Sequence, residues 1–141
     1  MAMKDVRSPG FGLLDAVVDA LPFKLYVVDK AMNVVAWNKK GEDGEFGVKK
    51  EDAVGKSLSP ALNFHRDKII SPKNFETMME EFGEVFSNGI IVRKEEVSLL
   101  RSGDKRYYLV TKVPLYADGP DSVSHVITII EDVTEKRMME L

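Results

Sequence analysis

The sequence predicts an α+β fold, in which a five-stranded antiparallel sheet carries helices on one face and an N-terminal amphipathic helix flanks the other. Three observations lead to this prediction. Two β-rich segments near the start precede a stretch rich in glycine and charge, one strongly periodic helix follows, and three β-rich segments joined by short turns close the chain. Successive strands joined by short turns form antiparallel meanders. The 141 residues suit one domain with its own core.

The first elements are a helix and a hairpin. Residues 11–22 place leucines and valines at helical spacing, and Pro22 ends the helix. Residues 23–29 and 34–38 are rich in β-formers and predict two strands with a turn between them. Residues 39–59 are too broken by glycine and charge for one long helix, so short helical turns are expected.

The helix over residues 71–89 has the clearest pattern. Ser71 is a candidate N-cap, Pro72 suits the first helical position, and Asn88 and Gly89 form a stop signal. Its apolar side chains recur at helical spacing: Phe75, Met78, Met79, Phe82, Val85 and Phe86. Three strands are then expected, over residues 90–100, 106–116 and 123–133. Residues 135–141 favour helix, but about two helical turns alone are marginal in water.

The composition is that of an ordinary globular protein, with 44% hydrophobic and 30% charged residues. The net charge is −3 and the basic residues are scattered, so we expect no nucleic acid partner. Neither a run of about 18 apolar residues nor a secretory leader occurs, so this segment is expected to make no membrane contact. The chain has no cysteine, which excludes disulfides and thiolate zinc sites and fits a cytoplasmic location.

Three segments carry a family resemblance. They are "VVAWNKKGEDGEFGVKKEDAVGKSL", "LLRSGDKRYYLVTKVPLYADG" and "IIEDVTEKR", in this order and with compatible spacing. Together they resemble the PAS domain family, over residues 21–137. The resemblance implies a sensory input domain of bacterial signal-transduction proteins, such as the sensor histidine kinases of two-component systems. It also implies three parts: a flanking helix (1–22), the PAS domain (23–134) and the start of a C-terminal linker helix (135–141) that leads to an output domain.

Several catalytic motifs can be set aside. The "GKS" at residues 55–57 lacks the earlier glycine of a phosphate-binding loop, because Lys50 stands in its place. The "HRD" at residues 65–67 lacks the asparagine of a kinase catalytic loop, because Pro72 stands there. With only His65 and His125, the chain offers no metal site and no catalytic constellation. We therefore expect a regulatory sensor domain and no enzyme.

Strand alternation separates two faces of the last three strands. The PAS resemblance implies that Ile130 points inward, toward the long helix. The candidate ligand cavity then consists of Phe75, Met78, Met79, Phe82, Glu96, Ser98, Tyr108, Val110, Lys112, Val126, Thr128 and Ile130. Two interpretations stay open: the polar members line a site for a small polar ligand, or Glu96 and Lys112 pair with each other or reach the rim of the sheet.

The outer face of the same strands is apolar and needs a cover. The N-terminal helix can supply it, either from the same chain or from a second copy, and the PAS resemblance favours a homodimer. The residues expected at this contact are Leu14, Val17, Val18, Leu21, Leu109, Ile127 and Ile129.

Asp132 and Thr134 mark the expected signal output junction. Their short side chains can satisfy backbone donors where the last strand meets the linker helix, with Thr134 as the predicted N-cap.

The sequence leaves the cofactor open. We expect none, with noncovalent haem or flavin as the alternative; the missing cysteine excludes a covalent flavin adduct, and His65 is expected in a solvent-facing loop. The predicted function is a sensory and dimerisation module that couples ligand, redox or partner binding to an output helix. The alternative is a ligand-free protein–protein interaction domain.

Overall fold

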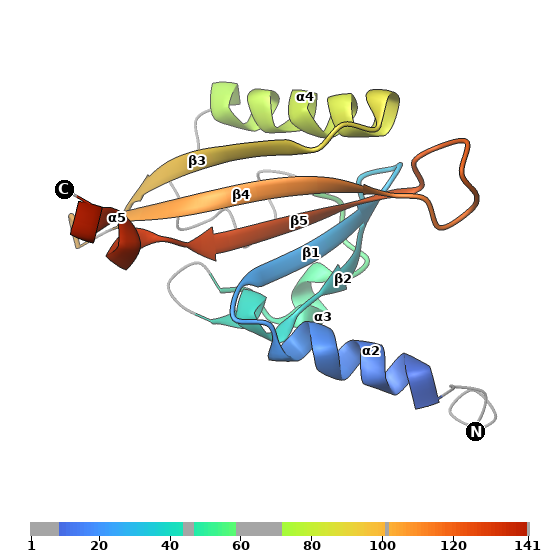
Figure 1. The fold of residues 1–141 in the computed structure, drawn as a ribbon, viewed down its shortest axis with the longest axis horizontal. Coiled ribbons are helices and arrows are strands. Elements are labelled where there is room, and N and C mark those ends of the chain that lie inside the picture. The colour runs from blue at the N-terminus through green and yellow to red at the C-terminus, as the bar shows by residue number, and fades with distance from the viewer. Residues whose placement is uncertain (1–8, 44–46, 59–71, 101, 141) are drawn as a thin grey trace.

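A computed structural model describes residues 9–43, 47–58, 72–100 and 102–140. It shows the predicted five-stranded antiparallel sheet with helices around it, which confirms the fold class (Figure 1). The strands are β1 (Lys24–Asp29), β2 (Val34–Trp37), β3 (Val92–Leu99), β4 (Lys105–Leu115) and β5 (His125–Asp132).

The strand order in the sheet is β2-β1-β5-β4-β3, and all neighbouring strands run antiparallel. The last strand, β5, therefore lies in the middle, between the first strand and β4. Lys24 at the start of β1 pairs with Ile130 near the end of β5. This pairing brings the point where the chain enters the sheet next to the point where it leaves.

The helices follow the periodicity of the sequence. They are α2 (Pro9–Ala20), the 3-10 helix η1 (Lys39–Glu42), α3 (Lys50–Ala53), α4 (Pro72–Asn88) and α5 (Thr134–Glu140). The expected N-cap of α4, Ser71, lies outside the described residues, as does His65. None of the helices in the described ranges is long and apolar enough to cross a membrane.

Gly89 directly follows α4, and two features of the structure favour glycine at this position. Gly89 has a φ of +64°, in the left-handed region that glycine adopts most readily. A Cβ atom built at Gly89 would also lie 2.5 Å from the Tyr116 hydroxyl. The glycine therefore lets the chain leave α4 and start toward β3 close beside the end of β4.

The hydrophobic core lies between the inner face of the sheet and the helices. Its buried members are Tyr26, Val28, Val34, Trp37, Val48, Ala53, Leu58, Phe82, Val85, Val123 and Val126. The rings of Tyr26 and Trp37 stack at 5.6 Å between centroids, and the indole Nε1 of Trp37 donates to the Val48 carbonyl at 3.0 Å. Helix α4 contributes Phe82 and Val85, two of the positions that its periodicity predicts.

Asn38, at the end of β2, is fully buried and joins three elements. Its Nδ2 donates to the carbonyls of Val18 in α2 (3.1 Å) and Phe23 (2.9 Å). Its Oδ1 accepts from the backbone amides of Leu25 in β1 (2.9 Å) and Gly41 in η1 (3.1 Å). This one side chain fixes the end of α2 to the sheet.

Helix α2 lies beside η1, beyond the β2 side of the sheet (Figure 1). Leu13, Leu14 and Val17 are 64%, 66% and 49% exposed. On the outer sheet face, Val97 and Leu99 are more than half exposed. Within one chain, α2 therefore leaves these outer-face residues open, and a cover from a second copy stays a prediction.

Candidate sensory face and output junction

Burial alternates along the strands, and the predicted inner face is the buried one. Val110, Lys112, Val126 and Thr128 are all less than 5% exposed, while the residues between them are partly exposed. Ile130 packs against the core, as the PAS resemblance implies. Ligand binding by these residues stays a prediction.

Four charged residues form a cluster between α4 and the sheet. Glu81 of α4 contacts Lys94 of β3 at 2.6 Å and Lys112 of β4 at 3.3 Å, and Lys94 also contacts Glu96 at 3.3 Å. The Lys112 ammonium lies 5.0 Å from the centre of the Phe82 ring, a cation–π arrangement. Of the alternatives left open for Glu96 and Lys112, direct pairing is not found, because the carboxylate that contacts Lys112 is that of Glu81.

The two lysines of this cluster titrate differently. Burial lowers the pKa of Lys112 below its ordinary value, although the charge of Glu81 opposes the change. Burial also acts to lower the pKa of Lys94, but Glu81 and Glu96 together raise it above its ordinary value. Of the two lysines, Lys112 is the one whose charged form is less favoured by its surroundings.

Thr128 and Tyr26 form a second polar pair on the inner face, opposite each other in β5 and β1. Thr128 is 1% exposed, and its hydroxyl finds no hydrogen bond of good geometry among the described residues. Burial raises the pKa of Tyr26, an effect that the nearby Thr128 hydroxyl only partly offsets. The Tyr26 phenol therefore stays protonated at neutral pH.

Two pockets in the described part of the chain include different members of the predicted cavity set, which stays a prediction as a whole. Tyr108 and Ile130 line a pocket of about 370 Å³ at the end of the sheet, which we call the junction pocket. Met79 and Phe82 line a separate groove of about 410 Å³, beside the β1–β2 turn. Between the two, Lys112 takes part in the charged cluster.

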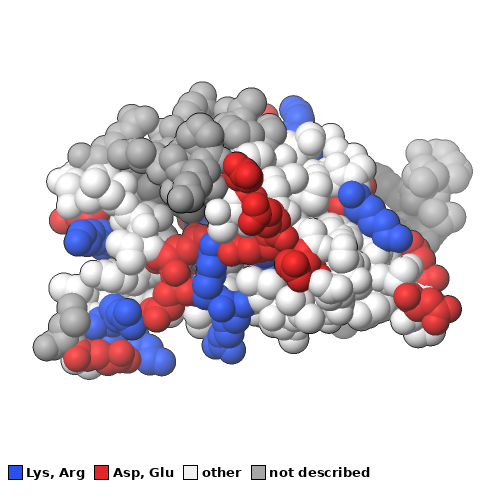
Figure 2. Space-filling view, turned by 90° about the horizontal axis from the view of Figure 1, so that it is seen from above, with Lys and Arg blue, Asp and Glu red and all other residues white. Residues whose placement is uncertain are grey.

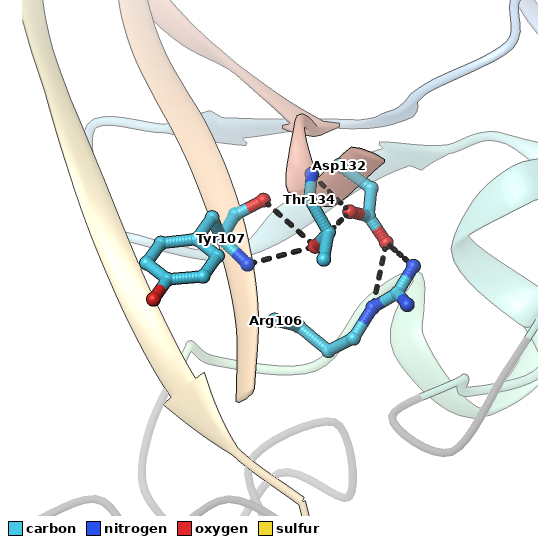
Figure 3. Close-up of polar contacts among 4 residues, drawn as sticks. All are labelled: Arg106, Tyr107, Asp132 and Thr134. Atoms are coloured by element: carbon cyan, nitrogen blue, oxygen red, sulfur yellow. Dashed lines mark hydrogen bonds and ion pairs between the residues drawn. The ribbon is translucent and has the colours of Figure 1, made fainter. Parts of the chain in front are cut away.

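A set of hydrogen bonds around Thr134 holds the start of α5, the candidate output junction (Figure 3). The Thr134 hydroxyl donates to the Asp132 carboxylate at 2.6 Å and accepts from the backbone amide of Tyr107 in β4 at 2.9 Å. The other oxygen of Asp132 pairs with the Arg106 guanidinium, whose Nε donates at 3.1 Å. The first residue of α5 is thus bound to β4 and to the end of β5.

Thr134 is not the N-cap of α5, which corrects the prediction. The helix begins at Thr134 itself, and Asp132 accepts the Thr134 amide at 3.0 Å. Asp132 therefore does the capping, because its Oδ1 reaches the first free amide while the Thr134 hydroxyl turns toward Tyr107.

Helix α5 has a second attachment one turn later. The Arg137 guanidinium pairs with Glu95 of β3 at 3.1 Å and lies 5.8 Å from the centre of the Tyr107 ring. Since Tyr107 also contacts Thr134, strands β3 and β4 both hold the first turns of the helix.

Hydrogen bonds stabilise the ionised form of Asp132. Burial acts to raise the pKa of Asp132, but hydrogen bonds from Thr134 and Arg106 outweigh it and bring the pKa below its ordinary value. The carboxylate is therefore ionised at neutral pH and available to both partners.

The described residues can be compared with what a noncovalent haem would need. An axial ligand would be expected on α4 or the strand after it, and neither contains histidine. His125 lies at the start of β5, with its Nδ1 2.8 Å from the Ser124 hydroxyl. Within the described ranges, no three His, Cys, Asp or Glu side chains gather as a metal site would need.

Sequence reasoning missed three residues that shape this region: Asn38, Glu81 and Arg106. Arg106 has the same strand parity as Tyr108 and Lys112, so extending the alternation to the end of β4 would have found it. Glu81 precedes the buried Phe82, but only the apolar positions of α4 were used to define its inner side. The hydrogen bonds of Asn38 depend on main-chain groups, which leave no signal in the sequence.

The face that carries α4 and β3 shows many acidic side chains across its centre (Figure 2). Helix α4 contributes the exposed residues Glu76, Glu80 and Glu84.

Comparison with known proteins identifies the fold. The family described as "PAS fold" matches residues 18–138. The PAS domain of Bordetella pertussis BvgS has a TM-score of 0.69 at 22% identity, covering 94% of this chain and 93% of that chain. A PAS domain from Colwellia psychrerythraea has a TM-score of 0.63 at 20% identity, with 88% and 97% covered.

A third similar structure is the sensory box sensor histidine kinase from Vibrio cholerae. Its TM-score is 0.58 at 20% identity, covering 94% of this chain and 95% of that chain. A search of curated proteins gave no significant match. Because the family match spans most of the sequence and these structures share the fold, the chain belongs to the PAS fold family.

Proposed function

We propose that this chain is the input and dimerisation module of a signalling protein, where it couples binding of a ligand, a redox change or a partner to a C-terminal output helix. A sensor histidine kinase of a two-component system, or a similar protein, would supply the output. The sensor histidine kinase among the similar structures supports this choice. In this proposal residues 1–22 form the flanking helix, 23–134 the sensory domain and 135–141 the start of the linker.

One observation carries the proposal: Thr134 binds both Asp132 and the backbone of Tyr107. The side chain is 8% exposed, so these hydrogen bonds form where water competes little. A shift of β4 against β5 would break or move them. The start of α5 would then move with the sheet, which is what an input domain has to achieve.

Hydrogen exchange tests this coupling. Thr134→Val removes the hydroxyl but keeps the shape, so the amides of Tyr107 and Arg137 should exchange about tenfold faster, as expected for one lost hydrogen bond. Thr111→Val is the matched control, because the Thr111 hydroxyl makes no hydrogen bond to a described residue. Unchanged exchange at both amides in Thr134→Val would reject Thr134 as the coupling residue.

The dimer part of the proposal rests on apolar surface. Leu13 and Leu14 of α2 are about two-thirds exposed, and Val97 and Leu99 of β3 are more than half exposed. Neither patch is covered within the described part of one chain, and apolar patches on a soluble surface often mark protein contacts. A second copy can cover both by placing its α2 on the outer sheet face.

A ligand-free interaction domain is the second candidate. It is favoured by the packing under α4, where Phe82 and Lys112 are buried and Glu81 pairs with Lys112. Denaturing mass analysis of freshly purified protein separates the two candidates. A released small molecule supports sensing, whereas protein alone, together with capture of a defined partner on the outer face, supports the interaction domain.

A further inference from the structure

The junction pocket lies where the chain enters and leaves the sheet. Phe23, just before β1, and Ile130, near the end of β5, lie on its walls. Its volume of about 370 Å³ is in the range of small-molecule sites, which start near roughly 300 Å³. A molecule bound here would touch both the segment that follows α2 and the strand that precedes α5.

The pocket combines apolar walls with positive charge. Phe23, Tyr108 and Ile130 provide apolar surface. The charged residues that line the pocket are Lys24, Lys40, Arg106, Asp43 and Asp132. The basic residue best placed for recognition is Arg106, because its planar guanidinium can bind a carboxylate through two parallel hydrogen bonds.

Arg106 is already paired with Asp132, but this pair is exchangeable. The two side chains are 39% and 38% exposed, and pairs so open to solvent contribute little to stability. A carboxylate arriving in the pocket can therefore take the guanidinium at little cost. Asp132 would then keep only its contacts with Thr134, on the output side (Figure 3).

We propose that the junction pocket binds a small organic carboxylate with an apolar body, and that this ligand competes with Asp132 for Arg106. The inference rests on the proposed function in one respect, since it assigns the effect of binding to the Asp132–Thr134 contact. One guanidinium suits the carboxylate of a monoanion, and the apolar walls need a ligand with carbon surface.

Backbone NMR titration of the whole chain tests the binding. Benzoate should cause saturable shifts at Phe23, Tyr108 and Ile130, whereas the neutral isostere benzamide, which lacks the charge, and inorganic phosphate, which lacks the apolar body, should each bind several-fold more weakly. Equal shifts with benzoate and benzamide, or no saturable shift with benzoate, would overturn the proposal.

Variants test the competition. Arg106→Gln should weaken benzoate binding by up to about fivefold, the range expected of an ion pair this open to solvent, and Arg106→Lys should weaken it less. Asp132→Asn should strengthen binding, because the guanidinium no longer has a competing carboxylate. Arg93→Gln, an exposed residue of β3 outside the pocket, is the matched control and should change nothing. Weaker binding in Asp132→Asn, or equal losses in Arg93→Gln and Arg106→Gln, would contradict the competition.

The same titration separates this inference from the proposed function. Benzoate-dependent shifts at Thr134 and Arg137 support both the ligand inference and the proposed function. Shifts at the pocket residues without shifts at Thr134 and Arg137 overturn the link between ligand binding and the Asp132–Thr134 contact. If benzoate fails to bind while Thr134→Val still changes exchange in α5, the inference fails and the proposed function stands.

Discussion

Asn38 shows how much of this fold depends on one side chain. It makes four hydrogen bonds to backbone groups of α2, the α2–β1 link, β1 and η1, and all are shielded from water. Removing it takes a partner from two backbone carbonyls and two backbone amides, and a polar group left without a replacement partner costs more than the lost bond alone.

Asn38→Ala should therefore lower the free energy of unfolding by about 3 kcal/mol or more. Urea denaturation followed by circular dichroism measures this change. Asn88→Ala is a suitable control, since Asn88 is exposed and bonds only to Glu84 in the same helix. Equal losses of unfolding free energy in the two variants would show that the buried hydrogen bonds of Asn38 do not stabilise the fold as the structure indicates.

Asp132 predicts a dependence of stability on pH. Its pKa is lowered in the folded protein, so its contribution is complete above the unfolded pKa, about pH 4, and is lost as pH falls through the folded pKa. The stability difference between the wild type and Asp132→Asn should be constant near neutral pH and shrink below about pH 4. Denaturant melts at several pH values measure it, and a difference that grows in acid would contradict the sign.

At the scale of elements, α4 is held to the sheet by apolar contacts and by the Glu81 cluster. Lys112 is 2% exposed and depends on Glu81, while Glu81 has Lys94 as a second partner. The two partners are therefore not equivalent. Removing Glu81 leaves the buried cation of Lys112 without a carboxylate, whereas removing Lys112 leaves Glu81 paired with Lys94.

Glu81→Ala should lower the free energy of unfolding by about 3–5 kcal/mol, because Lys112 stays buried without its carboxylate. Lys112→Met, which places an apolar chain of similar length there, should be nearly neutral or stabilising. Thermal and urea melts of both variants, with the exposed Glu80→Ala as control, measure the difference. A larger loss in Lys112→Met than in Glu81→Ala would show that the lysine itself stabilises α4.

The elements were predictable because each has a strong local pattern. The 3.6-residue period of α4 and the β-branched runs of β4 and β5 act within the segment itself. The position of α2 was not predictable in the same way, since its place beside η1 depends on Asn38 and on Lys39, whose amide bonds to Asp19. Contacts between distant segments decide where a correctly predicted helix lies.

At the scale of the whole molecule, the exposed apolar residues of α2 predict self-association. Leu14→Lys keeps the helix but places a charge in the contact, so it should shift a dimer toward the monomer without changing the circular dichroism spectrum. Analytical ultracentrifugation at several concentrations measures this. The exposed Asp15→Lys on the same helix is the control, and a wild type that stays monomeric at high concentration would contradict the dimer.

Sheet order could be inferred only through the family resemblance. Pairing of the first strand with the last depends on contacts about a hundred residues apart, and no local pattern specifies them. That pairing creates the junction pocket and sets Arg106 against Asp132, so the candidate site was harder to predict than the elements around it. The sequence still indicated Asp132 and Thr134, because the closing motif contains both.

The central claim is that the hydrogen bonds of Thr134 couple a shift of β4 against β5 to a movement of α5. The most direct test fuses this chain through α5, in continuous helical register, to a dimeric histidine kinase core and measures autophosphorylation. The account predicts that Thr134→Val changes the rate several-fold relative to the wild-type fusion, while Thr111→Val leaves it unchanged. Equal rates in all three fusions would contradict the claim.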